Sequence, residues 1–214
     1  MLWFGEHLIT EVAAMKNDTL KKLKAMRLPA FADAYQKQIN HEDEYNSMSF
    51  HERLMLLVDA EYDSRHNNNI KRLIKNAKFS DSSAFLGVNA CQFGYKTRYI
   101  RLPELFSELE AARIQGKYHQ VMKQFQKFSL VILDEFLLIP ASNQEQRDLL
   151  ELMEYRCGQV STIFCSQFMP EGWHERLGGS ALADSILDRI IPSAYTMRID
   201  GDVSMRQRKR IIKG

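Results

Sequence analysis

The sequence predicts an α/β protein in which a small all-helical module precedes a parallel-sheet domain. Two patterns support this prediction. Residues 19–79 repeat apolar side chains at helical spacing, whereas the chain beyond residue 88 alternates short apolar runs with helical segments. Continuous apolar runs of about 4 to 6 residues between helices are typical of parallel strands buried on both faces. With 214 residues, 45% of them hydrophobic, the chain is long enough to form a core in both parts.

The helical module is expected to contain several amphipathic helices. Leu20 and Leu23 recur at helical spacing, and Pro29 suits the first turn of the next helix. Ser49 and Glu52 have the spacing of a capping box, which predicts a helix that starts there. Its expected apolar stripe consists of Phe50, Leu54, Leu57, Val58 and Tyr62. A further stripe consists of Ile70, Leu73, Ile74 and Ala77.

The second part is expected to alternate strands with helices after a polar break at residues 80–83. The predicted strands cover residues 96–102, 129–134, 160–166 and 194–199. The predicted helices cover residues 103–115, 118–128, 144–157 and 185–191.

Positive charge is clustered along the chain, although the net charge is only +2. Clusters of this kind are expected in proteins that neutralise the phosphates of nucleic acid, whereas a solvated helix face is the alternative. The candidate DNA-binding residues are Lys21, Lys22, Lys24, Arg27, Lys71, Arg72, Lys75 and Lys78. A third basic cluster consists of Arg206, Arg208, Lys209, Arg210 and Lys213.

Composition argues against a secreted or membrane protein. The chain has three cysteines without a C-x-x-C pair, and no apolar run approaches the roughly 18 to 20 residues that cross a bilayer. The six histidines show no metal-ligand spacing. We therefore expect a cytoplasmic protein with no membrane partner.

The stretch LVILDEF predicts a nucleotide-associated acidic pair. Its strand ends just before Asp134, so the following carboxylates emerge at the carboxyl edge of the sheet, where ligands of open α/β sheets bind. Asp134 could hold Mg²⁺ through a water, and Glu135 could polarise the water that attacks a γ-phosphate. The alternative is a solvated acidic turn.

Three more polar residues are candidates for the same site. Ser166 and Gln167 follow the next predicted strand, where a polar side chain could orient the attacking water. Arg189 could act as an arginine finger that reaches the nucleotide of a neighbouring subunit. The alternatives are a turn residue for Gln167 and an ion pair with Asp184 or Asp188 for Arg189.

These motifs resemble the IstB family of insertion-sequence transposition helper ATPases, which are AAA+ proteins related to the loader of the bacterial replicative helicase. The likeness runs from about Met15 nearly to the end of the chain. It is carried by TLKKLKAMRLPAFADAY, SFHERLMLLVDAEYDSR, LVILDEF, STIFCSQFMPEGWHER and ALADSILDRIIPSAYTMRI. The resemblance implies a helical DNA-binding domain, an ATPase domain that uses ATP and Mg²⁺, homo-oligomers on DNA and a cognate transposase.

By motif match, the resemblance also implies roles for single residues. Asp134 and Glu135 take the Walker B positions, with Asp134 as the Mg²⁺ ligand. Gln167 occupies the sensor position, next to Ser166. Arg189 is the candidate arginine finger.

The phosphate-binding loop that should accompany this acidic pair is missing. The pattern G-x-x-x-x-G-K-[ST] occurs nowhere in the sequence. Comparison with the family pattern predicts an internal deletion near residues 84–86 that removed this loop and the first, central strand. The expected organisation is an atypical leader 1–14, a helical DNA-binding domain 15–79, a linker and deletion junction 80–87, and a truncated AAA+ domain 88–214.

Three functional hypotheses follow. The first is an ATP-binding transposition helper that binds target DNA and stimulates its transposase; the missing loop predicts impaired ATP binding and no hydrolysis. The second is an ATP-independent DNA-binding or assembly protein. The third is a non-functional remnant of a mobile element.

Overall fold

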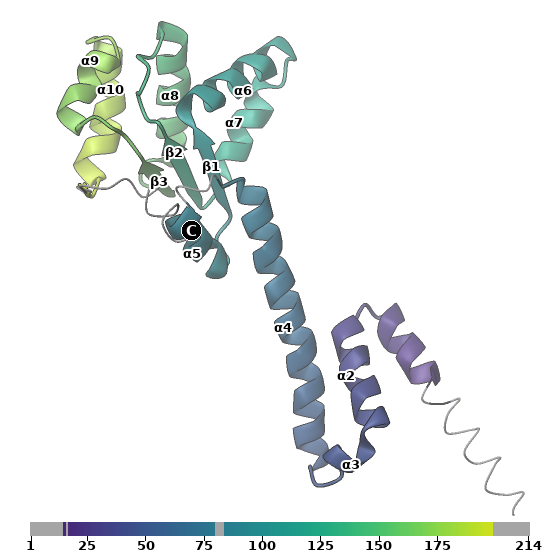
Figure 1. The fold of residues 1–214 in the computed structure, drawn as a ribbon. Helices are drawn as coiled ribbons and strands as arrows, with labels where there is room; N and C mark the ends of the chain where they lie inside the picture. The colour runs from purple at the N-terminus through teal and green to yellow at the C-terminus, as the bar shows by residue number, and fades with distance from the viewer. Residues whose placement is uncertain (1–14, 16, 80–83, 199–214) are drawn as a thin grey trace, which may run out of the picture. The chain divides into compact units, whose positions relative to one another are not determined.

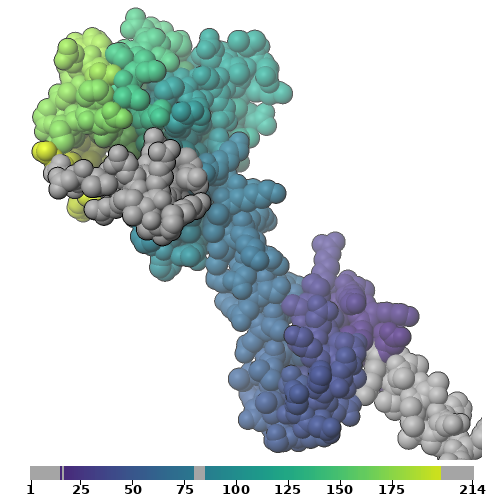
Figure 2. Space-filling view, in the orientation of Figure 1, coloured from purple at the N-terminus to yellow at the C-terminus, as the bar shows by residue number. Residues whose placement is uncertain are grey.

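The computed structural model describes residues 15, 17–79 and 84–198. The predicted leader, the break at residues 80–83 and the third basic cluster lie outside these residues. The chain divides into two compact units, Met1–Asn69 and Ile70–Gly214. In Figure 2 the first unit is coloured purple and blue, and the second is coloured teal, green and yellow.

The first unit is helical, as predicted. A helix over residues 17–25 is followed by α2 (Pro29–Asn40), α3 (Glu42–Tyr45) and the part of α4 (Phe50–Ala77) up to residue 69. Pro29 occupies the first turn of α2, as its fixed φ favours.

One buried carboxylate joins α2 to α4. Glu61 on α4 accepts a hydrogen bond of 3.0 Å from the backbone N–H of Phe31, in the first turn of α2, and one of 2.7 Å from Arg65. Because no side chain caps α2 at Leu28, Glu61 supplies an acceptor for one of its free N–H groups. Burial raises the pKa of Glu61, but the hydrogen bonds from Arg65 and Phe31 and the charge of Arg65 outweigh it, so the pKa lies below its usual value.

The start of α4 confirms the predicted capping box. The backbone N–H of Ser49 donates to the Glu52 carboxylate at 2.7 Å, and the Glu52 N–H donates to the Ser49 hydroxyl at 3.3 Å. The predicted apolar stripe is largely unburied: Leu57 is buried, but Phe50 is 81% and Tyr62 68% exposed. Helical spacing identifies side chains that share a face, but it does not say whether another element covers that face.

The second unit is an α/β domain, which confirms the predicted class. Within the described residues, β1 (Thr97–Arg101), β2 (Leu130–Asp134) and β3 (Ser161–Phe164) form one parallel sheet in the order β1-β2-β3. Besides the end of α4, its α-helices are α5 (Ala84–Gln92), α6 (Leu102–Ile114), α7 (Tyr118–Gln126), α8 (Asn143–Arg156), α9 (Trp173–Arg176) and α10 (Ala181–Ile190). Short 3₁₀ helices cover Pro170–Gly172 and Ile191–Ser193.

The two faces of this sheet are covered by different helices (Figure 1). Val131 and Leu133 belong to the main core, to which α6, α7, α8 and α10 contribute buried side chains. Leu130 and Ile132 point to the opposite face, where they pack with Tyr99 and with Ala90 of α5. The alternation of side chains along β2 therefore produces a three-layered arrangement.

Helix α5 begins inside the predicted linker. Residues 84–87 were expected to belong to a connection, but they form the first turn of α5. This helix buries Cys91 in a cluster with Leu73 and Ala77. Gly87 packs closely against the Phe79 ring. A Cβ atom at this position would lie only 2.1 Å from the ring carbon Cε1. Packing of Ala90 against the sheet thus helps to hold α5 in place.

The predicted strand over residues 194–199 is wrong for the part that the structure describes. Residues 194–198 have no regular secondary structure, and Tyr195 is fully exposed. A strand needs a hydrogen-bonded neighbour, and in the described sheet β3 pairs only with β2. The other side of β3 is consequently an open edge of the described sheet.

A buried guanidinium joins three elements of the second unit. Arg156, in the last turn of α8, is fully buried. It donates to the Phe125 carbonyl at 2.6 Å, the Phe128 carbonyl at 3.0 Å and the Thr162 hydroxyl at 2.9 Å, and also to the Ser161 carbonyl. Burial lowers its pKa to about 10, so Arg156 stays charged at neutral pH.

None of the described helices combines the length and apolar character required to cross a membrane.

Candidate functional site

The acidic pair lies at the carboxyl end of β2, as predicted. Asp134 is the last residue of the strand, and its carboxylate accepts hydrogen bonds from the Tyr99 hydroxyl at 2.6 Å and from the backbone N–H of Glu135 at 2.8 Å. The register pairs Arg101 with Asp134, so the last residues of β1 and β2 lie side by side. The carboxylate is thus held in place by the neighbouring strand.

Glu135 begins the turn after β2 and has a positive φ of 52°. This left-handed conformation is uncommon for a residue with a side chain. The Glu135 carboxylate lies 3.8 Å from the Arg101 guanidinium, which also donates to Glu104 at 3.0 Å. The hydrogen bond and charge of Glu104 raise the pKa of Arg101, and the charge of Glu135 adds to this effect. Arg101 is therefore shared between two carboxylates.

Ser166 lies next to this acidic turn. Its hydroxyl donates to the Phe136 carbonyl at 2.9 Å and lies 3.2 Å from the indole nitrogen of Trp173. The backbone N–H of Phe136 donates to the Cys165 carbonyl at 2.8 Å, which continues the contact between β2 and β3 beyond the strands. Gln167, the next residue, is exposed, and its side chain makes no hydrogen bond with the part of the chain that the structure describes.

Arg189 lies on α10 and takes part in an ion pair within the chain. Its guanidinium donates to Glu154 on α8 at 2.8 Å and to the Ser185 carbonyl at 2.7 Å. The alternative expected from the sequence was an ion pair with Asp184 or Asp188, but the partner is Glu154. Reaching a neighbouring subunit's nucleotide would require breaking this pair.

Sequence reasoning missed Tyr99 and Arg101. Both come from β1, which the sequence identified as a strand without assigning it a neighbour. Had β1 been placed beside β2, the parallel register would have brought its last residues to the edge that carries Asp134. A polar residue at the end of each strand was the available signal.

The eight basic candidates described by the structure are all exposed. Four of them belong to the first unit: Lys21, Lys22, Lys24 and Arg27. Of these, Lys22 forms an ion pair with Asp18 at 2.7 Å. The other four candidates belong to the second unit, although they were expected in the helical domain; they are Lys71, Arg72, Lys75 and Lys78. Within α4 the buried Leu73 and Ala77 lie between these cations, so the basic side chains point away from the core.

The fold and the acidic edge define an α/β protein of the P-loop-like class. The chain belongs to the family described as IstB-like ATP binding protein, which matches residues 82–212. This match covers more than half of the 214 residues.

Relatives from insertion sequences align with most of the chain. It is 28% identical to the insertion sequence ATP-binding protein y4pL of Sinorhizobium fredii, with 92% of this chain and 99% of the relative covered. It is 28% identical to y4uH of the same organism, with 91% and 97% covered. The ATP-binding protein of insertion sequence IS1162 from Pseudomonas fluorescens is 28% identical, with 72% and 87% covered.

The residues at the acidic edge meet only part of the requirements for ATP and Mg²⁺. Protein-bound Mg²⁺ usually has one or two carboxylate ligands and completes its shell with waters and substrate phosphates. Asp134 and Glu135 could supply the carboxylates, but the described residues contain no group of three or more acidic, histidine or cysteine side chains suited to a metal. The loop that would present N–H groups and a lysine to the phosphates has no counterpart in the sequence.

Proposed function

We propose that this protein is an insertion-sequence transposition helper that binds DNA and a cognate transposase, assembles on DNA as a homo-oligomer, and neither binds ATP tightly nor hydrolyses it. The observation that carries this proposal is an acidic pair in the position expected for a nucleotide hydrolase, in a chain without a phosphate loop. Family membership supports the helper role. The exposed basic side chains support DNA binding, because Lys and Arg neutralise backbone phosphates.

An internal deletion explains the missing loop. The alignment with the first Sinorhizobium relative runs over 243 residues, which exceeds the 214 residues of this chain. That alignment therefore includes positions at which this chain has no residue, although it covers 99% of the relative. The open edge of β3 and the absence of a strand over residues 194–198 agree with the loss of a strand between them.

The acidic edge has no complete catalytic set in this proposal. Asp134 remains tied to Tyr99, Glu135 stays near Arg101, and Arg189 keeps its ion pair with Glu154. The resemblance implies nucleotide-directed roles for these residues. Without the phosphate loop, however, they have no bound γ-phosphate on which to act.

Thermal melting of the purified protein with ATP and Mg²⁺ tests the nucleotide part. A ligand that binds only the folded state stabilises it by about 2.7 kcal/mol at a hundredfold excess over its dissociation constant. We expect a cooperative transition that millimolar ATP and Mg²⁺ do not shift. A clear upward shift that disappears in Asp134→Asn would overturn this part of the proposal, and the lack of a cooperative transition would favour a non-functional remnant.

Fluorescence anisotropy with a labelled duplex tests the DNA part. We expect binding that weakens steeply with salt and does not require ATP. Charge reversal at Lys71, Arg72 and Lys75 should weaken this binding, whereas Arg53→Glu, at a part-buried arginine that hydrogen-bonds Gln38 in the first unit, should change it less. If the parent protein shows no affinity for DNA at low salt, the proposal is wrong.

A further inference from the structure

A fourth basic stretch lies in the second unit and was not among the clusters identified from the sequence. No aspartate or glutamate occurs from residue 111 to residue 133. The cationic side chains in this interval are Arg113, Lys117, Lys123 and Lys127, and His119 lies among them. Most of the interval is occupied by α7 and its flanking turns.

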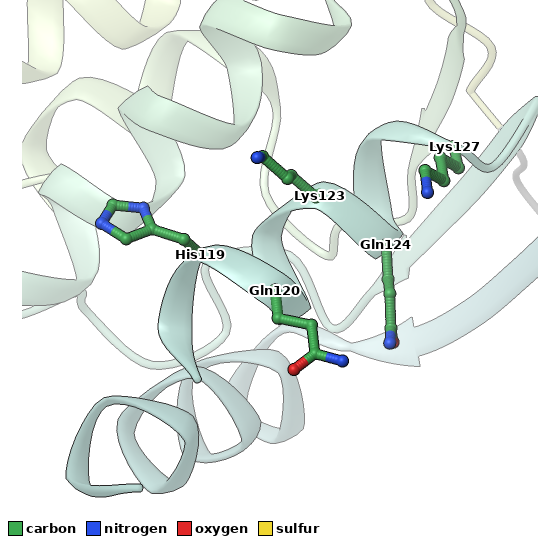
Figure 3. Close-up of a pocket in the computed structure, with 5 residues that line it drawn as sticks. All are labelled: His119, Gln120, Lys123, Gln124 and Lys127. Carbon is green, nitrogen blue, oxygen red and sulfur yellow. The ribbon is translucent and has the colours of Figure 1, made fainter. Parts of the chain in front are cut away.

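Helix α7 separates buried apolar from exposed polar side chains. Met122 and Phe125 are almost completely buried in the main core. The exposed surface carries two neighbouring rows at four-residue spacing, which we call the basic row and the glutamine row. The basic row consists of His119, Lys123 and Lys127, and the glutamine row consists of Gln120 and Gln124. These five side chains line an open hollow of about 410 Å³ (Figure 3).

Carboxylates that face α7 from the neighbouring helix α8 are already engaged. Asp148 accepts from Arg113 at 2.6 Å and lies 3.0 Å from the Tyr118 hydroxyl. Glu151 lies 2.8 Å from the same hydroxyl. Lys123 and Lys127, in contrast, form no ion pair with any residue that the structure describes. The basic row therefore presents positive charge that the described part of its own unit does not neutralise.

The end of α7 is also joined to α8 by hydrogen bonds. Arg156 donates to the carbonyls of Phe125 and Phe128, at and just after the end of α7. These bonds fix the last turn of the helix, from which Lys127 projects. A backbone that is held in this way loses less conformational freedom on binding than a mobile loop.

We propose that the basic row and the glutamine row of α7 bind the sugar-phosphate backbone of nucleic acid, as a second DNA contact of the transposition helper. This inference rests on the proposed function, because the nucleic acid is the DNA that the helper binds. Side chains four residues apart lie roughly 6 Å apart along a helix, a spacing at which two lysines can reach adjacent phosphates. Glutamine amides supply further donors to phosphate and sugar oxygens.

The chemistry of the hollow favours nucleic acid over a peptide. Grooves that bind an amphipathic peptide helix offer apolar pockets to its anchoring side chains. All five lining residues in this hollow are polar or cationic, and none is acidic. The surface therefore suits a polyanion that is read by charge and hydrogen bonding.

The test uses the full chain and a labelled duplex of about 30 base pairs, long enough to cover several phosphate contacts. Lys123→Glu/Lys127→Glu should weaken binding roughly tenfold and reduce the slope of log affinity against log salt by about two, because two phosphate contacts are lost. Lys123→Gln/Lys127→Gln should have a smaller effect. Arg147→Glu, at an exposed arginine on α8, is a control for the change in net charge. It is compared with the single variants Lys123→Glu and Lys127→Glu, which change the net charge equally.

Each outcome decides between the proposals. Binding by the parent protein with an unchanged slope in the double variant refutes the α7 contact and leaves the proposed function intact. A parent protein that does not bind DNA refutes both. A double variant that binds DNA normally but loses binding to polyglutamate refutes nucleic acid as the ligand in favour of an acidic polypeptide. Melting temperatures equal to that of the parent show that the variants are folded.

Discussion

Replacement of Arg156 by lysine should destabilise the second unit strongly. The four hydrogen bonds of Arg156 go to three carbonyls and one hydroxyl; the bond to Phe125 is buried and the other three are part-buried. A lysine has one ammonium group and cannot reach acceptors on α7 and β3 together. A buried acceptor that loses its donor costs about 1–3 kcal/mol, so loss of two or more should cost roughly 3–5 kcal/mol. This is a large share of the roughly 5–15 kcal/mol by which domains are stable.

The assay is thermal and urea unfolding followed by circular dichroism. For a unit of this size, each kcal/mol lowers Tm by about 2–4 °C, so Arg156→Lys should melt roughly 10 °C below the parent. Arg156→Met, which also leaves the carbonyls without donors, should be similarly unstable. Arg147→Lys on the exposed side of the same helix should melt with the parent. If Arg156→Lys melts within about 2 °C of the parent, these hydrogen bonds contribute far less than the loss of buried donors implies.

Three other changes test the local interactions. Glu61→Gln should destabilise the first unit by about 1–2 kcal/mol at neutral pH. The pKa of Glu61 lies below 4.5 in the folded state, so its stabilising contribution is present above that pH and is lost as acid protonates the carboxylate. The unfolding curves of Glu61→Gln and the parent should therefore converge in acid. Ser142→Ala should cost about 1 kcal/mol in urea unfolding because Ser142 forms a capping box, whereas Ser180→Ala should cost almost nothing because its side chain caps nothing. Gly87→Ala should lower Tm because the new Cβ would collide with the ring of Phe79, and adding Phe79→Leu should recover part of the loss. If Gly87→Ala melts at the same temperature as the parent, the close contact is contradicted.

Local patterns predicted the elements whose determinants are local. The capping box at Ser49 places the start of α4, and the apolar run before Asp134 places β2. These features depend on residues within one or two turns of each other. The acidic edge followed directly, because a residue that ends a parallel strand must lie at the carboxyl edge of the sheet.

Features that depend on distant partners were not predictable in the same way. The apolar stripe containing Phe50 predicted burial that the described fold does not provide, and residues 194–198 were expected to form a strand that has no neighbour in the described sheet. Tyr99 and Arg101 reach the site only through the register between β1 and β2. The burial of Arg156 likewise depends on distant partners, because its hydrogen bonds go to α7 and β3.

Trp173 gives this protein a natural optical probe. The chain has two tryptophans, Trp3 and Trp173, so Trp3→Phe would leave a single fluorophore. Trp173 is only 7% exposed, packs edge-on against Phe136 at 4.8 Å between ring centroids, and places its indole nitrogen 3.2 Å from the Ser166 hydroxyl. Its emission should therefore respond to any rearrangement of the turn that carries Glu135, which would allow nucleotide, metal ion and DNA to be compared in one cuvette without an added dye.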